Sequence, residues 1–229
     1  MKNILKRIGA YLIDIIIVSI IAAVLSNISA LNSQLDSYVD VYDEYIKIQS
    51  EYKNEKIKEE EFEKNLNHLS YELEKCSVAS SIISIACIIA YFGIFQYSQN
   101  GRTIGKKIFK LKVVKNDDKD LSIGRFLLRS VILNNIIFTV ANIVCVSVLK
   151  QSDYMKCAKF ISNFELIVQI LILIMMVMSE NNRGLHDYIA GTKVIDITTS
   201  SLEDSKEKKK KKVIDGEIIE KIKDPKKSN

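Results

Sequence analysis

The sequence predicts an all-α membrane protein with four transmembrane helices, an extracytoplasmic coiled helical hairpin and a small cytoplasmic β-hairpin. The average composition, 48% hydrophobic and 27% charged, is that of a soluble protein, but the two classes of residue are separated along the chain. Four nearly uncharged runs are each long enough to supply the roughly 20 helical residues that cross a bilayer. They span residues 8–30, 77–97, 126–149 and 160–179.

The first run also has features of a secretory signal peptide, because Lys2, Lys6 and Arg7 precede an apolar stretch. Two observations favour a retained transmembrane anchor instead. Asp14 interrupts the stretch, and the stretch is longer than the roughly 7–15 apolar residues of a signal peptide.

Lysine and arginine set the predicted orientation, because they concentrate in cytoplasmic loops. Residues 98–125 carry eight basic and three acidic residues, and the chain after Met178 carries twelve basic ones. The segment Leu31–Cys76 has six lysines against twelve acidic residues. We expect a multi-pass protein of the plasma membrane with both termini in the cytoplasm. The loop Lys150–Lys159, with three lysines, is the one exception.

Residues 31–76 are expected to form the outer helical hairpin. Positions spaced alternately by four and three, as in a coiled-coil seam, run through both of its halves. They are Leu31, Leu35, Tyr38, Tyr42, Tyr45, Gln49 and Tyr52, then Phe62, Leu66, Leu69, Leu73 and Cys76. A polar break near Asn54–Lys56 separates the halves. We favour a hairpin that packs against itself over a docking site for a partner.

Two segments expected in the cytoplasm are predicted to form structures other than helices. Ile108–Lys115 alternates in part between apolar and basic residues, and a polar turn leads from it to Leu121–Ile123, which predicts the β-hairpin. Residues 197–229 are rich in Ser, Lys and Glu and contain the run Lys208–Lys212. We expect a disordered tail that either contacts anionic lipid or is simply solvated.

The four cysteines give no CxxC or His/Cys spacing, so no metal site is predicted. Cys87 and Cys145 are interpreted as packing residues of the apolar runs. Cys76 and Cys157 fall near the outer surface, and whether they form a disulfide is left open. No nucleophile–base pair, cofactor motif or pair of carboxylates occurs in one place. We therefore expect no enzyme, no catalytic residue, no cofactor and no nucleic-acid partner.

Three segments carry a family resemblance. The first is Lys6–Asp14, and the third is Arg183–Val194. The second is Gly101–Lys107, followed by Leu111–Val114 and Arg129. In this order they resemble the RDD family of bacterial membrane proteins. The resemblance extends over residues 4 to 196 and suggests one membrane domain, residues 1–196, before the tail.

The RDD family is named for one arginine and two aspartates, which look like Arg7, Asp14 and Asp187 here. The role usually suggested for the family is transport. The chain departs from the family pattern in two places. Its outer segment is long, and Gly9 stands where members often carry a small or apolar residue.

The ionisable residues of the apolar runs predict a polar cavity that opens to the cytoplasm. Arg7 and Asp14 are two helical turns apart and project from one face of the first helix. An unpaired charge in the hydrocarbon costs at least about 2.5 kcal/mol, so we expect Asp14 to pair with Arg129. This pair either fixes helix packing or forms the floor of the cavity, where His186 could titrate near neutral pH. The residues expected at its mouth are Arg7, Arg102, His186 and Asp187.

A secondary polar line is predicted in the outer half of the membrane. Asn135, Thr139 and Asn142 share one face of the third run, and Asn142 should lie at a depth similar to Glu165. Such a line either marks an ion or proton path or supplies hydrogen bonds between helices.

The sequence therefore favours an ion- or proton-coupled transporter with an unknown substrate. The alternative is a non-transporting membrane adaptor that binds a partner through the outer hairpin or the basic tail. Four helices are few for a complete alternating-access carrier, so transport would imply a homo-oligomer in the lipid bilayer.

Overall fold

The computed structural model describes residues 2–116, 121–179 and 182–198. Three of its described helical segments are long and apolar enough to cross a membrane: Ile4–Ser26, Val78–Ser98 and Gln151–Met178. The first lies in α1 (Lys2–Ser26), and the third is α9 (Gln151–Met178). The middle one is continuous through α4 (Val78–Ile88), the π-helical η1 (Ile89–Phe95) and α5 (Gln96–Ser98).

The third predicted run is not one straight helix. It forms α7 (Ile123–Leu133) and α8 (Ile136–Val148), bent by 62° at the break between them. Asn135 stands at the break with φ 55° and ψ 27°, a left-handed conformation that asparagine adopts more readily than apolar residues do. The bent pair is a fourth span if its two helices cross the membrane together, so the structure gives three or four candidate spans among the described residues.

One face of α1 is buried against the other elements. Its buried residues are Arg7, Ala10, Asp14, Val18 and Ala22, which recur every three or four positions as one helix face requires. Val18 packs with Tyr91 and Phe92 of η1 in a core cluster. The opposite face of α1, with Leu12 and Ile16 exposed by more than half, suits contact with lipid.

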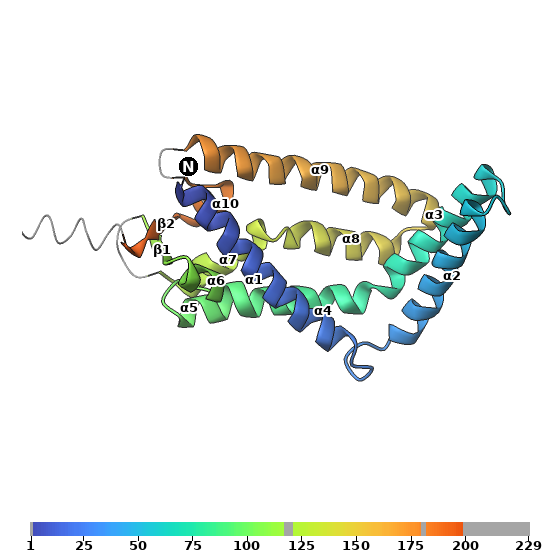
Figure 1. Ribbon diagram of the computed structural model, residues 1–229, viewed down its shortest axis with the longest axis horizontal. Coiled ribbons are helices and arrows are strands. Elements are labelled where there is room, and N and C mark those ends of the chain that lie inside the picture. Colours follow the sequence, from blue (N-terminus) through green and yellow to red (C-terminus); the bar gives the residue numbers. More distant parts are fainter. Residues whose placement is uncertain (1, 117–120, 180–181, 199–229) are drawn as a thin grey trace, which may run out of the picture.

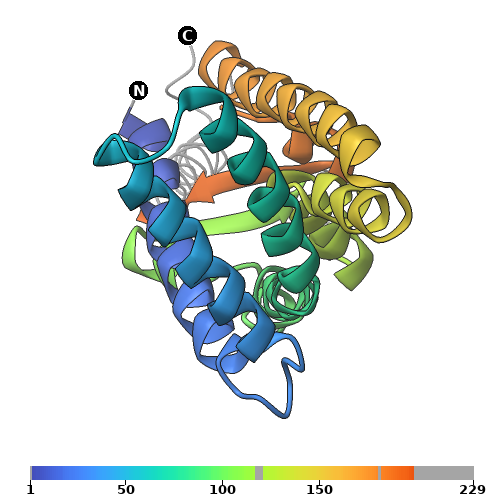
Figure 2. The same ribbon diagram turned by 90° about the vertical axis from the view of Figure 1, so that its right-hand side faces the viewer.

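Helices α2 (Leu35–Lys53) and α3 (Glu59–Cys76) pack against each other as the predicted hairpin. The rings of Tyr52 and Phe62 stack at 4.1 Å near its tip. The seam is only partly closed, because α2 has no buried residue and Tyr42 is 44% exposed. Figure 2 shows both helices lying across the ends of the longer ones.

The two-stranded sheet differs from the prediction. β1 (Leu111–Lys115) pairs antiparallel with β2 (Thr192–Asp196), so that Val113 faces Val194. The expected partner, Leu121–Ile123, instead leads into α7. Two strands distant in sequence replace the local hairpin, and they bring the chain after α9 back beside the loop that precedes α7.

The sheet lies at one end of the long helices together with α6 (Ile104–Ile108) and α10 (Leu185–Ala190), and the α2–α3 hairpin lies at the other (Figure 1). The predicted disordered tail from residue 199 onward and the predicted turn at residues 117–120 fall outside the described residues.

Candidate functional site

Asp14 is fully buried on the inner face of α1. Its Oδ1 accepts hydrogen bonds from the Tyr91 hydroxyl and the Gly105 amide, both at 2.7 Å. Its Oδ2 accepts a hydrogen bond from the Thr103 hydroxyl at 2.5 Å, and the Lys106 ammonium lies 3.7 Å away. Asp14 therefore joins α1 to η1 and to α6. Helix α6 lies outside the first apolar run, far along the chain from Asp14.

The short helix α6 is built to approach α1 closely. Thr103 caps it, with Oγ1 accepting a hydrogen bond from the Lys106 amide at 3.3 Å. A Cβ at Gly105 would lie 2.1 Å from the Ala10 carbonyl oxygen, a distance that real atoms do not reach. Glycine at this position is what lets the α6 backbone reach the Asp14 carboxylate.

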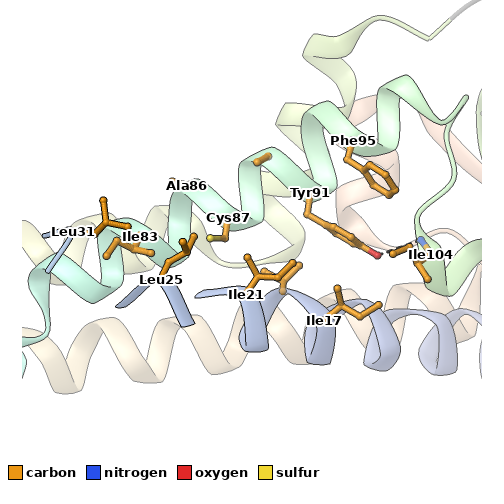
Figure 3. Close-up of a pocket in the computed structure, with 12 residues that line it drawn as sticks. Ile17, Ile21, Leu25, Leu31, Ile83, Ala86, Cys87, Tyr91, Phe95 and Ile104 are labelled. Atoms are coloured by element: carbon orange, nitrogen blue, oxygen red, sulfur yellow. Dashed lines mark hydrogen bonds between the residues drawn. The ribbon is translucent and has the colours of Figure 1, made fainter. Parts of the chain in front are cut away.

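Tyr91 reaches Asp14 from η1, where the helix widens to π geometry. Such widened turns often occur at functional sites. The Tyr91 hydroxyl also accepts a hydrogen bond from the Ile104 amide at 3.2 Å, drawn as a dashed line in Figure 3. The tyrosine therefore links the second span to the start of α6 as well as to α1.

A second buried carboxylate, Asp187 of α10, lies between two arginines from other helices. Arg7 donates Nη2–H to its Oδ2 at 2.5 Å, and Arg129 of α7 donates Nη1–H to its Oδ1. The Thr192 hydroxyl donates to the same Oδ1 at 3.2 Å. Burial alone would raise the pKa of Asp187, but the charges of Arg129 and Arg7 and the hydrogen bond from His186 hold it well below its usual value.

The expected ion pair between Asp14 and Arg129 is wrong. Arg129 pairs with Asp187, and Asp14 has Lys106 as its basic neighbour. The physical reason is that α6 and α10 fold back against the helices and supply nearer charges. Neither segment lies in an apolar run, so a search for partners within the runs passes over both.

A cavity of about 490 Å³ lies beside these charges, bordered by residues of α1, α6, α7, α9 and α10. Its ionisable and polar lining residues are Arg7, Tyr11, Lys106, Arg129, Asn135, Gln169 and His186. Within the described ranges, no carboxylate lines it, although Asp14 and Asp187 contact the basic side chains that do. The remaining wall is apolar and includes Leu111, Ile172 and Met176.

His186 does not titrate near neutral pH, contrary to the prediction. Its side chain is buried, and burial lowers its pKa to about 4 although the hydrogen bond with Asp187 opposes the shift. Lys106 is the group whose pKa falls into the neutral range. Burial first, and then the charge of Arg129, lower the pKa of Lys106 to about 7, while Asp14 opposes them.

A second cavity, of about 670 Å³, lies on another side of Asp14 between α1 and the second span. Its wall is apolar, with Ile17 and Ile21 of α1 facing Cys87 and Phe95 (Figure 3). Tyr91 lines this cavity and Lys106 lines the first one, and both contact Asp14. The Asp14 carboxylate therefore lies between the two cavities.

The remaining predicted residues lie elsewhere. Arg102 is not among the cavity-lining residues, and its buried Nε has no hydrogen-bond partner in the part of the chain that the structure describes. Glu165 accepts a hydrogen bond from Gln169 of its own helix. Asn142 instead bonds Glu74 at 3.1 Å. Within the secondary line, the hydrogen bonds of the described residues join only Thr139 to the Asn135 carbonyl oxygen, at 3.4 Å, so the line as a whole stays a prediction.

The sequence model of the RDD family matches residues 2–191. This chain belongs to the RDD family. RDD family proteins are membrane proteins, which agrees with the apolar helices described above. No curated protein and no solved structure matches the chain.

In this RDD protein the three residues that look like the arginine and the two aspartates of the family name divide between two buried clusters. Arg7 contacts Asp187, whereas Asp14 forms its own centre with α6. The prediction placed the three residues around one cavity but missed Tyr91, Thr103, Lys106 and Thr192. Thr103 and Lys106 stand inside the second family-like segment, so that motif was the available signal. Thr192 stands inside the third family-like segment, Arg183–Val194, which was its signal. Tyr91 offered none, because only the folded chain brings it to Asp14.

Proposed function

We propose that this RDD protein is an ion- or proton-coupled transporter whose coupling element is the layer of buried charge around Asp14 and Asp187. The observation that supports the proposal is the pair of fully buried carboxylates, each contacted by basic side chains, beside one cavity. Ionisable residues at membrane depth commonly mark ion or proton paths. Buried ion pairs are a poor way to gain stability, so packing alone does not call for them.

The proton in this proposal is carried by Lys106. With its pKa at about 7, Lys106 is charged below neutral pH and neutral above it. The groups that face it are Asp14 and Arg7 of α1, Arg129 of α7 and Asp187 of α10. Loss of the Lys106 proton removes the positive charge beside Asp14, and Lys106 is the only basic neighbour that the described residues give Asp14. The net charge around the cavity therefore falls by one.

The proposed orientation follows the distribution of lysine and arginine. The end with α6, α10 and the sheet faces the cytoplasm, and the α2–α3 hairpin lies outside the plasma membrane. The opposite placement of these two parts along the long helices supports this arrangement. Four spans follow if α7 and α8 together cross the bilayer.

The test is proton flux into proteoliposomes, followed with a pH-sensitive dye trapped inside. We expect wild-type protein to dissipate an imposed pH gradient and Asp14→Asn to lose that activity, because the amide keeps the shape but removes the charge. The matched control is Asp153→Asn, at an exposed site in the first turn of α9. Equal flux in Asp14→Asn and wild type, at equal reconstituted amounts, contradicts the proposal.

A second candidate function, a membrane adaptor, is favoured by one observation on the hairpin. Val39, Tyr42 and Ile46 of α2 are exposed by 47%, 44% and 45%. Their spacing places them on one helix face, so they form an apolar stripe on an otherwise charged hairpin. A stripe of this kind suits contact with another protein.

A further inference from the structure

The charges around the first cavity do not balance. Its buried basic residues are Arg7, Lys106 and Arg129, whereas the buried carboxylates next to it are Asp14 and Asp187. Three cations against two anions leave one positive charge in excess when Lys106 is protonated. An uncompensated charge in a low-dielectric site is costly, and an anion in the cavity would remove that cost.

The cations still have donors to offer such an anion. Both hydrogen bonds that Arg129 donates among the described residues leave from Nη1, so Nε and Nη2 keep their hydrogens available. Lys106 donates from Nζ to Thr103 at 3.3 Å and has further hydrogens on its ammonium group. His186 also lines the cavity, is 2% exposed, and has a ring Nδ1 without a partner in the described part of the chain.

The rest of the wall indicates what the anion is attached to. Ile8 of α1 and Leu173 of α9 line the cavity and are also 37% and 50% exposed. The apolar wall therefore continues from the buried charges to the surface that faces lipid, between α1 and α9. A free inorganic anion would leave this apolar wall without a contact, whereas an acyl chain would cover it.

We propose that this cavity binds an anionic amphiphile, with a phosphate or carboxylate head at Arg129 and Lys106 and an acyl chain along α9 between Ile8 and Leu173. A metal cation does not fit, because no carboxylate of the described residues lines the cavity. This ligand assignment extends the proposed transport function. Whether the bound ligand is itself transported rests on that proposed function. Binding itself is measured without any flux.

The experiment is native mass spectrometry of the full chain released from nonionic detergent after incubation with dioleoyl phosphatidic acid or dioleoyl phosphatidylcholine. These lipids share their acyl chains and differ in the head group. We expect retention of one phosphatidic acid molecule and little phosphatidylcholine. Inorganic phosphate is the competitor that separates a lipid head group from a free anion. Displacement of the lipid by phosphate at equal concentration would overturn the amphiphile assignment.

Two matched pairs of variants locate the site. Lys106→Gln and Lys107→Gln remove adjacent lysines of α6, the first buried at the cavity and the second exposed. We expect Lys106→Gln to weaken retention about tenfold or more, as loss of one charge-assisted hydrogen bond does, and Lys107→Gln to leave it unchanged. Leu173→Trp fills the cavity and should block retention. Leu171→Trp is its control, because Leu171 is exposed on the same helix but does not line the cavity.

The tryptophan pair keeps the test decisive if Lys106→Gln does not fold. Equal retention of the two lipids, or equal losses within each matched pair, would overturn the proposal and assign the lipid to the general surface. Proton flux that depends on Asp14 together with no lipid preference would leave transport standing and remove only the ligand assignment. Lipid preference without proton flux would support the ligand assignment and contradict the proposed transport.

Discussion

At the scale of single residues, His186 makes stability depend on pH in a defined window. Its folded-state pKa is about 4 against 6.5 for an unperturbed histidine, so the unfolded chain takes up the proton first as pH falls. The stability that His186 contributes is therefore fully present above about pH 6.5 and is lost as pH falls toward 4. Asp187 adds a loss only below its unperturbed pKa of 3.8, outside this window.

We expect the midpoint of thermal unfolding in detergent, followed by circular dichroism, to fall across that window. His186→Gln should flatten the dependence because it removes the titrating ring. The chain contains one other histidine, His68 of α3, which is exposed. His68→Gln is thus the matched control and should keep the wild-type slope. The same slope in His186→Gln would contradict the assignment.

A second residue-scale prediction concerns the cysteines. The sequence left open a disulfide between Cys76 and Cys157, but the structure brings Cys157 of α9 to Cys145 of α8, with 2.9 Å between the sulfur atoms of the free thiols. The diazene oxidant diamide should join this pair, taking up its two protons and two electrons. Maleimide labelling after denaturation should then fall from four sites to two. Cys76→Ser should still cross-link, and Cys157→Ser should not. Cross-linking that follows Cys76 would exclude this pair.

At the scale of elements, the contact between α6 and α1 depends on Gly105. A Cβ there meets the Ala10 carbonyl oxygen, which belongs to a helix backbone and cannot rotate away. Gly105→Ala should lower the free energy of unfolding by about 1–3 kcal/mol, the usual effect of overpacking, and loosen the contact with Asp14. Gly124→Ala is the control, since nothing lies within 4 Å of a Cβ at that position. Thermal unfolding of both variants in detergent measures the difference, and equal effects would mean that α6 is free to move.

The elements also show what the sequence can predict. The first two spans were predicted to within about four residues, because long apolar runs are sufficient evidence for them. The α2–α3 hairpin likewise follows from its heptad spacing. The bend at Asn135 was missed, because hydropathy carries no information on a single backbone angle. The partner of β1 was wrong, because pairing across some eighty positions leaves no local pattern.

At the scale of the whole molecule, the same limit applies to the site. The predicted residues Arg7, Arg129 and His186 line one cavity. Of these, Arg129 lies in an apolar run, where a charge must find an interior position. Which charge meets which was not predictable from depth alone. α6 and α10 fold back from outside the runs, and their Lys106 and Asp187 replace the direct pairing of Asp14 with Arg129.

The last prediction separates a transporter from an adaptor. Asn32 is buried and bonds both the Ser26 carbonyl oxygen, at 2.9 Å, and the Ser80 hydroxyl, at 3.2 Å, so the ends of the first two spans already lie together. Replacement of residues 35–76 by a short Gly/Ser turn should therefore leave the spans joined. It removes the contacts of α3 with α8 and α9, among them the bond from Tyr71 to Leu149, so protein abundance must be measured as well.

If the protein is a transporter, this deletion should retain much of the proton flux while Asp14→Asn abolishes it, because neither buried carboxylate lies in the hairpin. If it is an adaptor, the deletion should abolish the function of the protein in cells. Asp14→Asn should then reduce that function only by lowering protein abundance. Tyr42→Lys with Ile46→Lys is the milder test, since it places charge on the exposed stripe and spares the packing of α3. Loss of function in this variant at normal abundance, with flux intact, would assign the function to the stripe, because only a partner could sense that change.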